Sequence, residues 1–177
     1  MMARLVALFA ASLLAACAAT AGGEDEQPQG RIRDFAGIID AATEARLADR
    51  LTVAEREYGP QVGIVTVKSL DGRAIEDFAT DYSNKWGLGD RTRNDGLIIL
   101  IAPNERKVRI GTGLGIEQSY PDAWCQEVID KTMLPQFRQG NFDRGLEGAA
   151  DMIIARMRSH PTIPANDNAA VDARKAA

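Results

Sequence analysis

Two uninterrupted apolar segments constrain the fold of this chain more than any other feature of its sequence. Residues 62–67 read VGIVTV, and residues 97–102 read LIILIA. Runs of this kind are typical of strands covered on both faces, because a strand with one solvated face alternates polar and apolar side chains. Such strands need helices on both sides of their sheet, so the sequence predicts an α/β fold.

The segments around these strands add helices and one further strand. The spacing of apolar side chains predicts helices over residues 41–58, 74–86, 121–133 and 142–158. Residues 107–111 alternate in polarity, and the turn at 103–106 is so short that 97–102 and 107–111 must pair as an antiparallel β-hairpin. We therefore expect a three-layer α/β/α sandwich with a small mixed sheet that includes the hairpin.

The first residues are typical of an export signal. Arg4 precedes an apolar stretch, residues 5–15, that is too short to span a bilayer. The sequence LAAC at residues 14–17 resembles a bacterial lipobox, in which the cysteine is acylated and the bond before it is cut. The alternative interpretations are an ordinary cleaved signal with a chance cysteine, and a weak membrane helix.

These features predict the organisation of the chain. We expect a signal peptide over 1–16, a lipidated Cys17 followed by a flexible tether to residue 30, a folded domain over 31–158, and a disordered tail over 159–177. The lipid would anchor the protein to the membrane of the cell envelope, which in a Gram-negative cell favours the outer membrane and the periplasm.

Composition excludes several classes of function. The formal net charge is -4 and no basic stripe is present, so a nucleic acid is not expected as a partner. Beyond the leader the chain has one cysteine, Cys125, which rules out an internal disulfide and a CxxC motif for zinc or redox chemistry.

The hairpin predicts where polar residues meet. The start of strand 97–102 and the end of strand 107–111 lie at the same edge of the sheet, so Asp95 should lie beside the glycine-rich sequence GTGLG at 111–115. Glu117 and Asp122 follow closely. Carboxylates in such a loop suit a Ca²⁺ or Mg²⁺ ion, and the backbone of Gly113 and Gly115 would let a ligand approach closely.

Each of these residues also has a purely structural interpretation. Asp95 and the glycine after it favour a turn, Asp122 suits the first turn of a helix through the helix dipole, and Glu117 fits a solvated loop. Arg109, from the same strand edge, would hold a phosphate oxygen in two hydrogen bonds if the site takes a phosphoester.

Several motifs in order resemble the TPM domain family. They are RDFAGIID at 33–40, WGLG at 86–89, NDGLIIL at 94–100, RKVRI at 106–110 and FRQGNF at 137–142. Members of this family share a three-layer α/β sandwich, and some bind divalent cations such as calcium and show acid phosphatase activity. The resemblance implies that Asp34 joins Asp95, Glu117 and Asp122 as a metal ligand.

Two functions follow from these expectations, and the sequence leaves both open. The first is a metal-dependent phosphomonoesterase in which the acids hold the ion, while Asp95 and Arg109 serve the reacting phosphoryl group. The second is a non-enzymatic scaffold or assembly factor, tethered in the envelope, that binds a membrane-protein partner.

Overall fold

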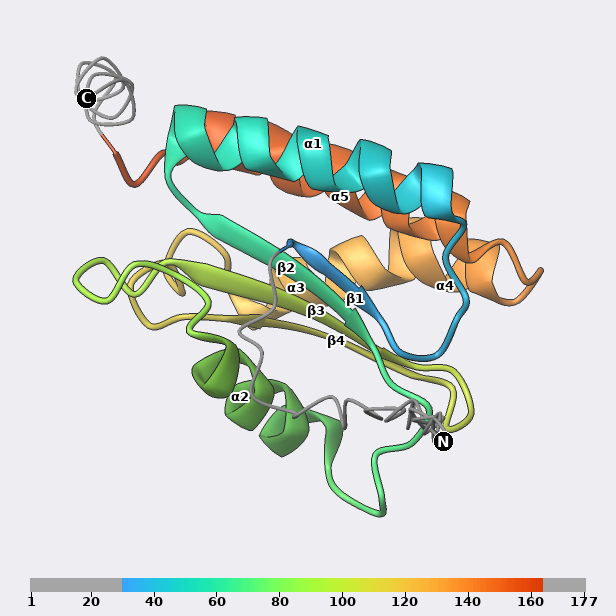
Figure 1. Ribbon diagram of the computed structural model, residues 1–177. Coiled ribbons are helices and arrows are strands. Elements are labelled where there is room, and N and C mark those ends of the chain that lie inside the picture. Colours follow the sequence, from blue (N-terminus) through green and yellow to red (C-terminus); the bar gives the residue numbers. More distant parts are fainter. Residues whose placement is uncertain (1–29, 164–177) are drawn as a thin grey trace, which may run out of the picture.

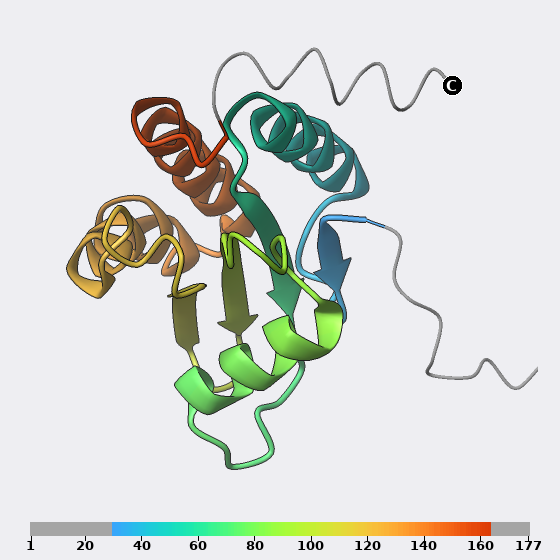
Figure 2. The ribbon, with the colours of Figure 1, turned by 90° about the vertical axis from the view of Figure 1, so that its left-hand side faces the viewer.

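The structure, a computed structural model, describes residues 30–163, which form a sheet between two layers of helices (Figures 1 and 2). In chain order the elements are β1 (Ile32–Asp34), α1 (Ala41–Tyr58), β2 (Gln61–Thr66), α2 (Ile75–Trp86), β3 (Gly96–Ala102), β4 (Lys107–Thr112), α3 (Asp122–Val128), the π-helical turn η1 (Ile129–Met133), α4 (Leu134–Phe137) and α5 (Phe142–Ser159). The predicted signal peptide, Cys17, nearly all of the tether and residues 164–177 lie outside the described range.

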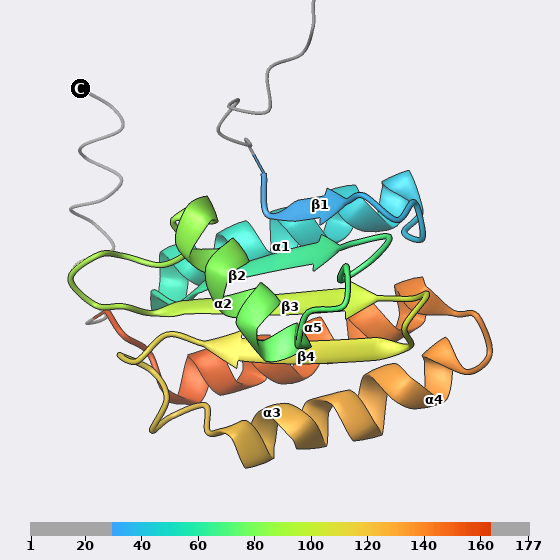
Figure 3. The ribbon, with the colours of Figure 1, turned by 90° about the horizontal axis from the view of Figure 1, so that it is seen from below.

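Within residues 30–163 the sheet has four strands, which lie side by side in chain order (Figure 3). β1, β2 and β3 are parallel, and β4 returns antiparallel to β3. The register pairs Leu97 with Thr112 and Ala102 with Lys107, which is the predicted β-hairpin. The expected three-layer α/β sandwich with a mixed sheet is therefore confirmed.

The two faces of the sheet are covered unequally (Figures 1 and 3). α1, α5 and the α3–η1–α4 segment cover one face, and its core includes Leu47, Ile64, Ile99, Ile110, Met133 and Ile153. α2 covers the other face over a smaller core that includes Val65, Leu70, Ile75, Ile98 and Leu100. β2 and β3 contribute side chains to both cores, which is why their sequences are apolar throughout.

Strand β1 was not predicted, because its three residues, IRD, carry no apolar run or alternation. Its edge position is secured by Arg33. The guanidinium lies 4.1 Å from the centre of the Trp86 ring, and its Nη1 donates a hydrogen bond of 2.8 Å to the Tyr82 hydroxyl. This cation–π contact ties β1 to α2, which covers the same face of the sheet.

The helix predicted over 121–133 is longer than expected and is interrupted. α3 passes into the π-helical turn η1, in which the N–H of Leu134 bonds to the carbonyl of Ile129, and α4 continues to Phe137. Pro135 has no N–H to donate and would crowd the carbonyl of Lys131 in a regular α-helix. The wider turn before the proline relieves this conflict, which the apolar spacing alone did not reveal.

The domain boundary predicted at residue 158 falls short of what the structure shows. α5 includes Ser159, and the next residues form an ordered C-terminal strap, residues 160–163. The N–H of Thr162 donates a 2.7 Å hydrogen bond to the carbonyl of Tyr58 at the end of α1. The first residues of the predicted tail are thus part of the folded domain. None of the helices in residues 30–163 has the length and hydropathy needed to cross a bilayer.

Candidate functional site

The predicted meeting of two loops at one edge of the sheet is present. The N–H of Gly113 donates a 2.7 Å hydrogen bond to the carbonyl of Gly96, and the N–H of Gly115 donates one of 3.1 Å to the carbonyl of Asn94. A Cβ at Gly115 would collide with the carbonyl of Arg93. The glycine loop, residues 111–115, is therefore pressed against the α2–β3 loop, residues 87–95, at a distance that a side chain would not allow.

An open cleft of about 430 Å³ lies between α2 and the β3–β4 hairpin. It is lined by Glu76, Ala79, Thr80, Ser83, Asn84, Leu88, Asn94, Gly96, Ile98, Arg109, Gly111, Thr112, Gly113, Leu114, Glu117 and Asp122. β4 presents no side chain to the cleft at Gly111, where a Cβ would lie 3.2 Å from Ile98 Cγ2, so backbone and Ile98 line the cleft there. This volume is within the range of small-ligand pockets.

The cleft is rich in negative charge. Among the described residues that line it, the carboxylates of Glu76, Glu117 and Asp122 face a single cationic side chain, that of Arg109. Arg109 is already paired, because its Nη2 lies 2.8 Å from Asp122 Oδ1. The Asp122 side chain is 73% exposed and that of Arg109 is 28% exposed, so the pair sits at the rim, where water weakens it. The cleft therefore favours a cationic ligand over an anionic one.

Asp95 does not face this cleft. Its side chain has no exposed surface and points toward the core on the α1–α5 side of the sheet. Oδ1 accepts a 2.9 Å hydrogen bond from the N–H of Asp90, and Oδ2 accepts 2.7 Å hydrogen bonds from Arg93 Nε and the Thr162 hydroxyl. The carboxylate thus holds the α2–β3 loop and the strap together, which is a structural arrangement rather than the predicted open ligand position.

Asp34 lies at the opposite end of the sheet from Asp95. It pairs with Thr66 at the carboxyl end of β2, whereas Gly96, next to Asp95, pairs with Gln61 at the amino end. Its carboxylate accepts hydrogen bonds from the N–H groups of Gly37 (3.0 Å) and Ile39 (2.9 Å) and from the Thr66 hydroxyl. Asp34 therefore shapes the loop before α1 and does not join Glu117 and Asp122.

Of the predicted site residues, the structure brings Arg109, Gly113, Glu117 and Asp122 to one cleft. The N–H groups of Gly113 and Gly115 are used in bonding to the α2–β3 loop, so they do not face a ligand here. Across residues 30–163, His, Cys, Asp and Glu side chains do not gather in threes that would hold a metal ion.

Four polar residues of α2 line the cleft and were missed by sequence reasoning. They are Glu76, Thr80, Ser83 and Asn84. Their spacing of four, three and one residues places them along one side of a helix, next to the apolar stripe that faces the sheet. This pattern was visible in the sequence, but nothing in it indicated that this side of the helix borders a cleft.

Cys125 lies in the core behind Asp122 and is a free thiol. Burial, with a smaller contribution from Asp122, raises the pKa of Cys125 to about 11. The thiolate is the nucleophilic form, so this side chain is a packing residue at neutral pH.

The comparisons with known proteins agree with this architecture. The model of the TPM domain matches residues 32–156. The N-terminal domain of a protein from P. gingivalis, solved by NMR, is similar with a TM-score of 0.68 and 28% sequence identity, covering 75% of this chain and 87% of that one.

Two further NMR structures are similar in fold. The N-terminal domain of a protein from Corynebacterium glutamicum has a TM-score of 0.58 and 18% identity, covering 72% of this chain and 79% of that one. A protein from the psychrophilic bacterium Bizionia argentinensis has a TM-score of 0.58 and 21% identity, covering 70% of this chain and 84% of that one. No curated protein matches the chain. The match to the TPM model spans the sheet and almost all of the helices, and the chain therefore belongs to the TPM domain family.

Proposed function

We propose that this chain is an exported, lipid-anchored binding module whose acidic cleft takes a positively charged segment of a membrane-protein partner in the cell envelope. The observation that carries the proposal is the charge of the cleft: three carboxylates line it against one guanidinium, which is bonded to Asp122. The charges of Glu76 and Glu117 are therefore not balanced by a cation among the described lining residues. Exposed carboxylates gathered in one cleft attract charge of the opposite sign, and this attraction is screened by salt.

The shape of the cleft suits a long basic side chain. Its volume of about 430 Å³ exceeds what one Lys or Arg side chain fills, and it opens beside Leu114, whose side chain is 78% exposed. An exposed leucine at the mouth offers an apolar contact for the methylene stem of such a side chain, while the charged head reaches the carboxylates.

The proposed anchor restricts where the partner lies. If Cys17 carries the lipid, the chain between it and β1 reaches at most about 50 Å when fully extended. The cleft would then meet membrane proteins or proteins held close to the same bilayer.

A charge-reversed pair of probes tests the proposal. A fluorescein-labelled tri-lysine peptide and a tri-glutamate peptide are titrated with the full chain in detergent, and binding is followed by fluorescence anisotropy. We expect binding of the tri-lysine peptide that weakens as salt is added, and a loss of about 5-fold in Glu76→Gln, equivalent to ~1 kcal/mol.

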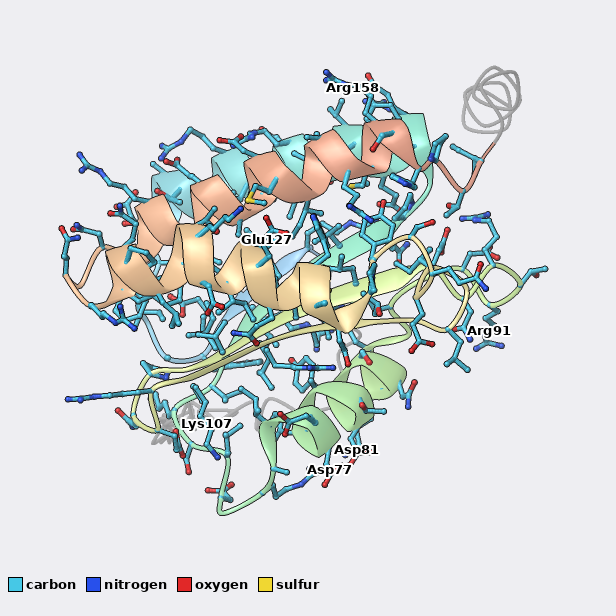
Figure 4. All side chains as sticks on the ribbon, turned by 180° about the vertical axis from the view of Figure 1, so that it is seen from behind. Asp77, Asp81, Arg91, Lys107, Glu127 and Arg158 are labelled. Atoms are coloured by element: carbon cyan, nitrogen blue, oxygen red, sulfur yellow. The ribbon has the colours of Figure 1, made fainter. Side chains whose placement is uncertain are left out.

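Asp77→Asn is the matched control for Glu76→Gln. Both acids lie in the first turn of α2, so both substitutions remove the same favourable charge from the helix N-terminus. Asp77 projects from the outer side of α2, away from the sheet (Figure 4), and does not line the cleft. Equal affinity of the two variants, or tighter binding of tri-glutamate, would overturn the proposal.

A metal-assisted phosphomonoesterase is the second candidate, and the meeting of Arg109, Glu117 and Asp122 in one cleft favours it. Glu117 and Asp122 are the oxygen donors present for a Ca²⁺ or Mg²⁺ ion, which would polarise a phosphoryl oxygen. Arg109 is placed to bind a second phosphoryl oxygen once Asp122 turns from it to the ion.

This candidate is tested by calorimetric titration of the full chain with Ca²⁺ and Mg²⁺, and by assay of a generic phosphomonoester. Cation binding and hydrolysis that are both lost in Asp122→Asn would support the enzyme. Hydrolysis that survives in Asp122→Asn and Arg109→Met would show that these residues do not carry it.

A further inference from the structure

We infer that Thr162 is a positioning residue for the cleft: its hydroxyl, through the buried Asp95 carboxylate, fixes the α2–β3 loop that holds the glycine loop at the cleft mouth. Thr162 lies beyond residue 156, where the match to the TPM domain ends. The strap thus lies outside the matched residues, and the cleft of this chain depends on it.

The strap runs past the junction of α1 and β2, where the missing Cβ of Gly59 leaves a slot for it. Figure 2 shows the chain beyond α5 passing this junction. Gly59 lies in this slot with φ +103°. A Cβ on Gly59 would collide with the Thr162 hydroxyl and lie 3.1 Å from the backbone nitrogen of Ile163. The 2.7 Å hydrogen bond from Thr162 N–H to the Tyr58 carbonyl fixes the strap in the slot, so its position is specified by two independent features.

From this slot Thr162 reaches a carboxylate that has no access to water. The Asp95 side chain is 0% exposed, so it depends on the protein for every hydrogen bond that it makes. Thr162 supplies one of them at 2.7 Å, and the other partners, Asp90 and Arg93, both belong to the α2–β3 loop. Removal of the hydroxyl takes away one of the two hydrogen bonds to Oδ2 and leaves Arg93 Nε as its remaining partner among the described residues. The remaining partners of the carboxylate then all belong to the α2–β3 loop, so the carboxylate no longer ties this loop to the strap.

The same loop supports the cleft. Asn94 has φ +52°, a left-handed conformation that costs free energy and persists where its surroundings hold it. Its carbonyl accepts a hydrogen bond from the N–H of Gly115, and the carbonyl of Gly96, two residues further on, accepts one from the N–H of Gly113. Asn94 and Gly113 line the cleft themselves, so a shift of the α2–β3 loop changes the cleft directly.

The test compares Thr162→Val with Thr162→Ser in the full chain. Valine has nearly the same shape as threonine but no hydroxyl, whereas serine keeps the hydroxyl and should restore the contact. We expect Thr162→Val to shift the amide NMR signals of Gly113 and Gly115 and to raise the hydrogen-exchange rate of Gly115 N–H at least 10-fold, and Thr162→Ser to reverse most of both changes.

Thr66→Val is the matched control. Thr66 also donates from its hydroxyl to an aspartate, Asp34, but at the opposite end of the sheet. It should lower stability as Thr162→Val does and leave the Gly113 and Gly115 signals in place. Unchanged glycine signals in Thr162→Val, or equal changes in Thr66→Val, would overturn the inference.

The test of Thr162 can succeed or fail independently of the test of the proposed function. The NMR and exchange measurements need no ligand, so they stand even if the tri-lysine peptide does not bind. If the peptide does bind, Thr162→Val is expected to weaken it several-fold and Thr162→Ser to restore it. This second arm rests on the proposed function, whereas the first does not.

Discussion

The Nε of Arg93 lies 2.7 Å from the carboxylate of Asp95, a side chain with no exposed surface, and pairs with it inside the α2–β3 loop. The same guanidinium also lies 3.6 Å from Asp90. A buried charge of this kind is tolerated because its partners compensate for the lost hydration. The pair thus places a stabilising contact in a segment that also borders the cleft.

We expect Arg93→Met to lower the free energy of unfolding by about 3 kcal/mol. This value is at the low end of the range for breaking a buried ion pair, because the Arg93 side chain is itself 38% exposed. Methionine keeps the aliphatic stem and removes the charge, so Asp95 is left charged and underpaired. Urea unfolding measures the change. The double variant Arg93→Met, Asp95→Asn should recover part of the loss, because the amide is neutral; no recovery would contradict the pairing.

Alkaline pH should destabilise the protein through Tyr120. Burial raises the pKa of Tyr120 to about 12, and Asp95 adds to the rise against the opposing effect of Arg156. The folded state therefore favours the neutral phenol. The contribution of Tyr120 to the free energy of unfolding is complete below pH ~10, the pKa of an unfolded tyrosine, and is lost as pH rises toward 12. The expected loss over this range is ~2–3 kcal/mol.

Tyr120→Phe isolates this effect. The Tyr120 hydroxyl has no hydrogen-bond partner among the described residues, so we expect stability at pH 7 to be unchanged or higher by about 1 kcal/mol. Urea midpoints measured from pH 7 to 11 should fall less steeply in Tyr120→Phe than in the wild type. Tyr58→Phe keeps Tyr120 and should follow the wild type; parallel curves for all three proteins would refute the assignment.

The strap should contribute to stability as well as to the cleft. A chain ending at Arg158 loses the hydrogen bonds from Thr162 to Tyr58 and Asp95. We expect its free energy of unfolding to be ~2 kcal/mol lower than that of the full chain. A chain ending at Ile163 keeps both contacts and is the control. Thermal unfolding compares the three, and equal midpoints would show that the strap is not part of the domain.

Cys17→Ser tests the proposed anchor. Labelled palmitate should enter the wild-type chain and not the variant, and the variant should move from the membrane fraction to the soluble fraction after cell disruption. Serine cannot form the thioether that carries the lipid. A wild-type chain that incorporates no palmitate would mean that LAAC at 14–17 is not a lipobox.

The parts of the fold that depend on local sequence were predictable. The strands at 62–67 and 97–102 and the hairpin follow from apolar runs and a short turn, and the structure places β2, β3 and β4 within one residue of them. β1 and the strap were not predictable, because each is short and depends on distant partners. Arg33 meets Trp86 of α2 on the same face of the sheet, and Thr162 meets Asp95, and neither contact leaves a periodic pattern.

The candidate site was predictable in position but not in every side chain. The hairpin correctly places the loop before β3 beside the loop after β4, and it brings Glu117 and Asp122 to the same cleft as Arg109. Asp95 was expected to point there too. Side chains alternate along a strand, so Gly96 and Ile98 face the cleft while Asp95 and Leu97 face the other layer of helices.

The reversal of β4 also sets the edge of the sheet at which the cleft opens. In open parallel α/β sheets, ligands bind beyond the carboxyl ends of the strands. Here Asn94 and Gly96 line the cleft at the amino end of β3, and Thr112 and Gly113 line it at the carboxyl end of the antiparallel β4. A molecule bound among these residues would therefore contact the edge opposite to the usual one.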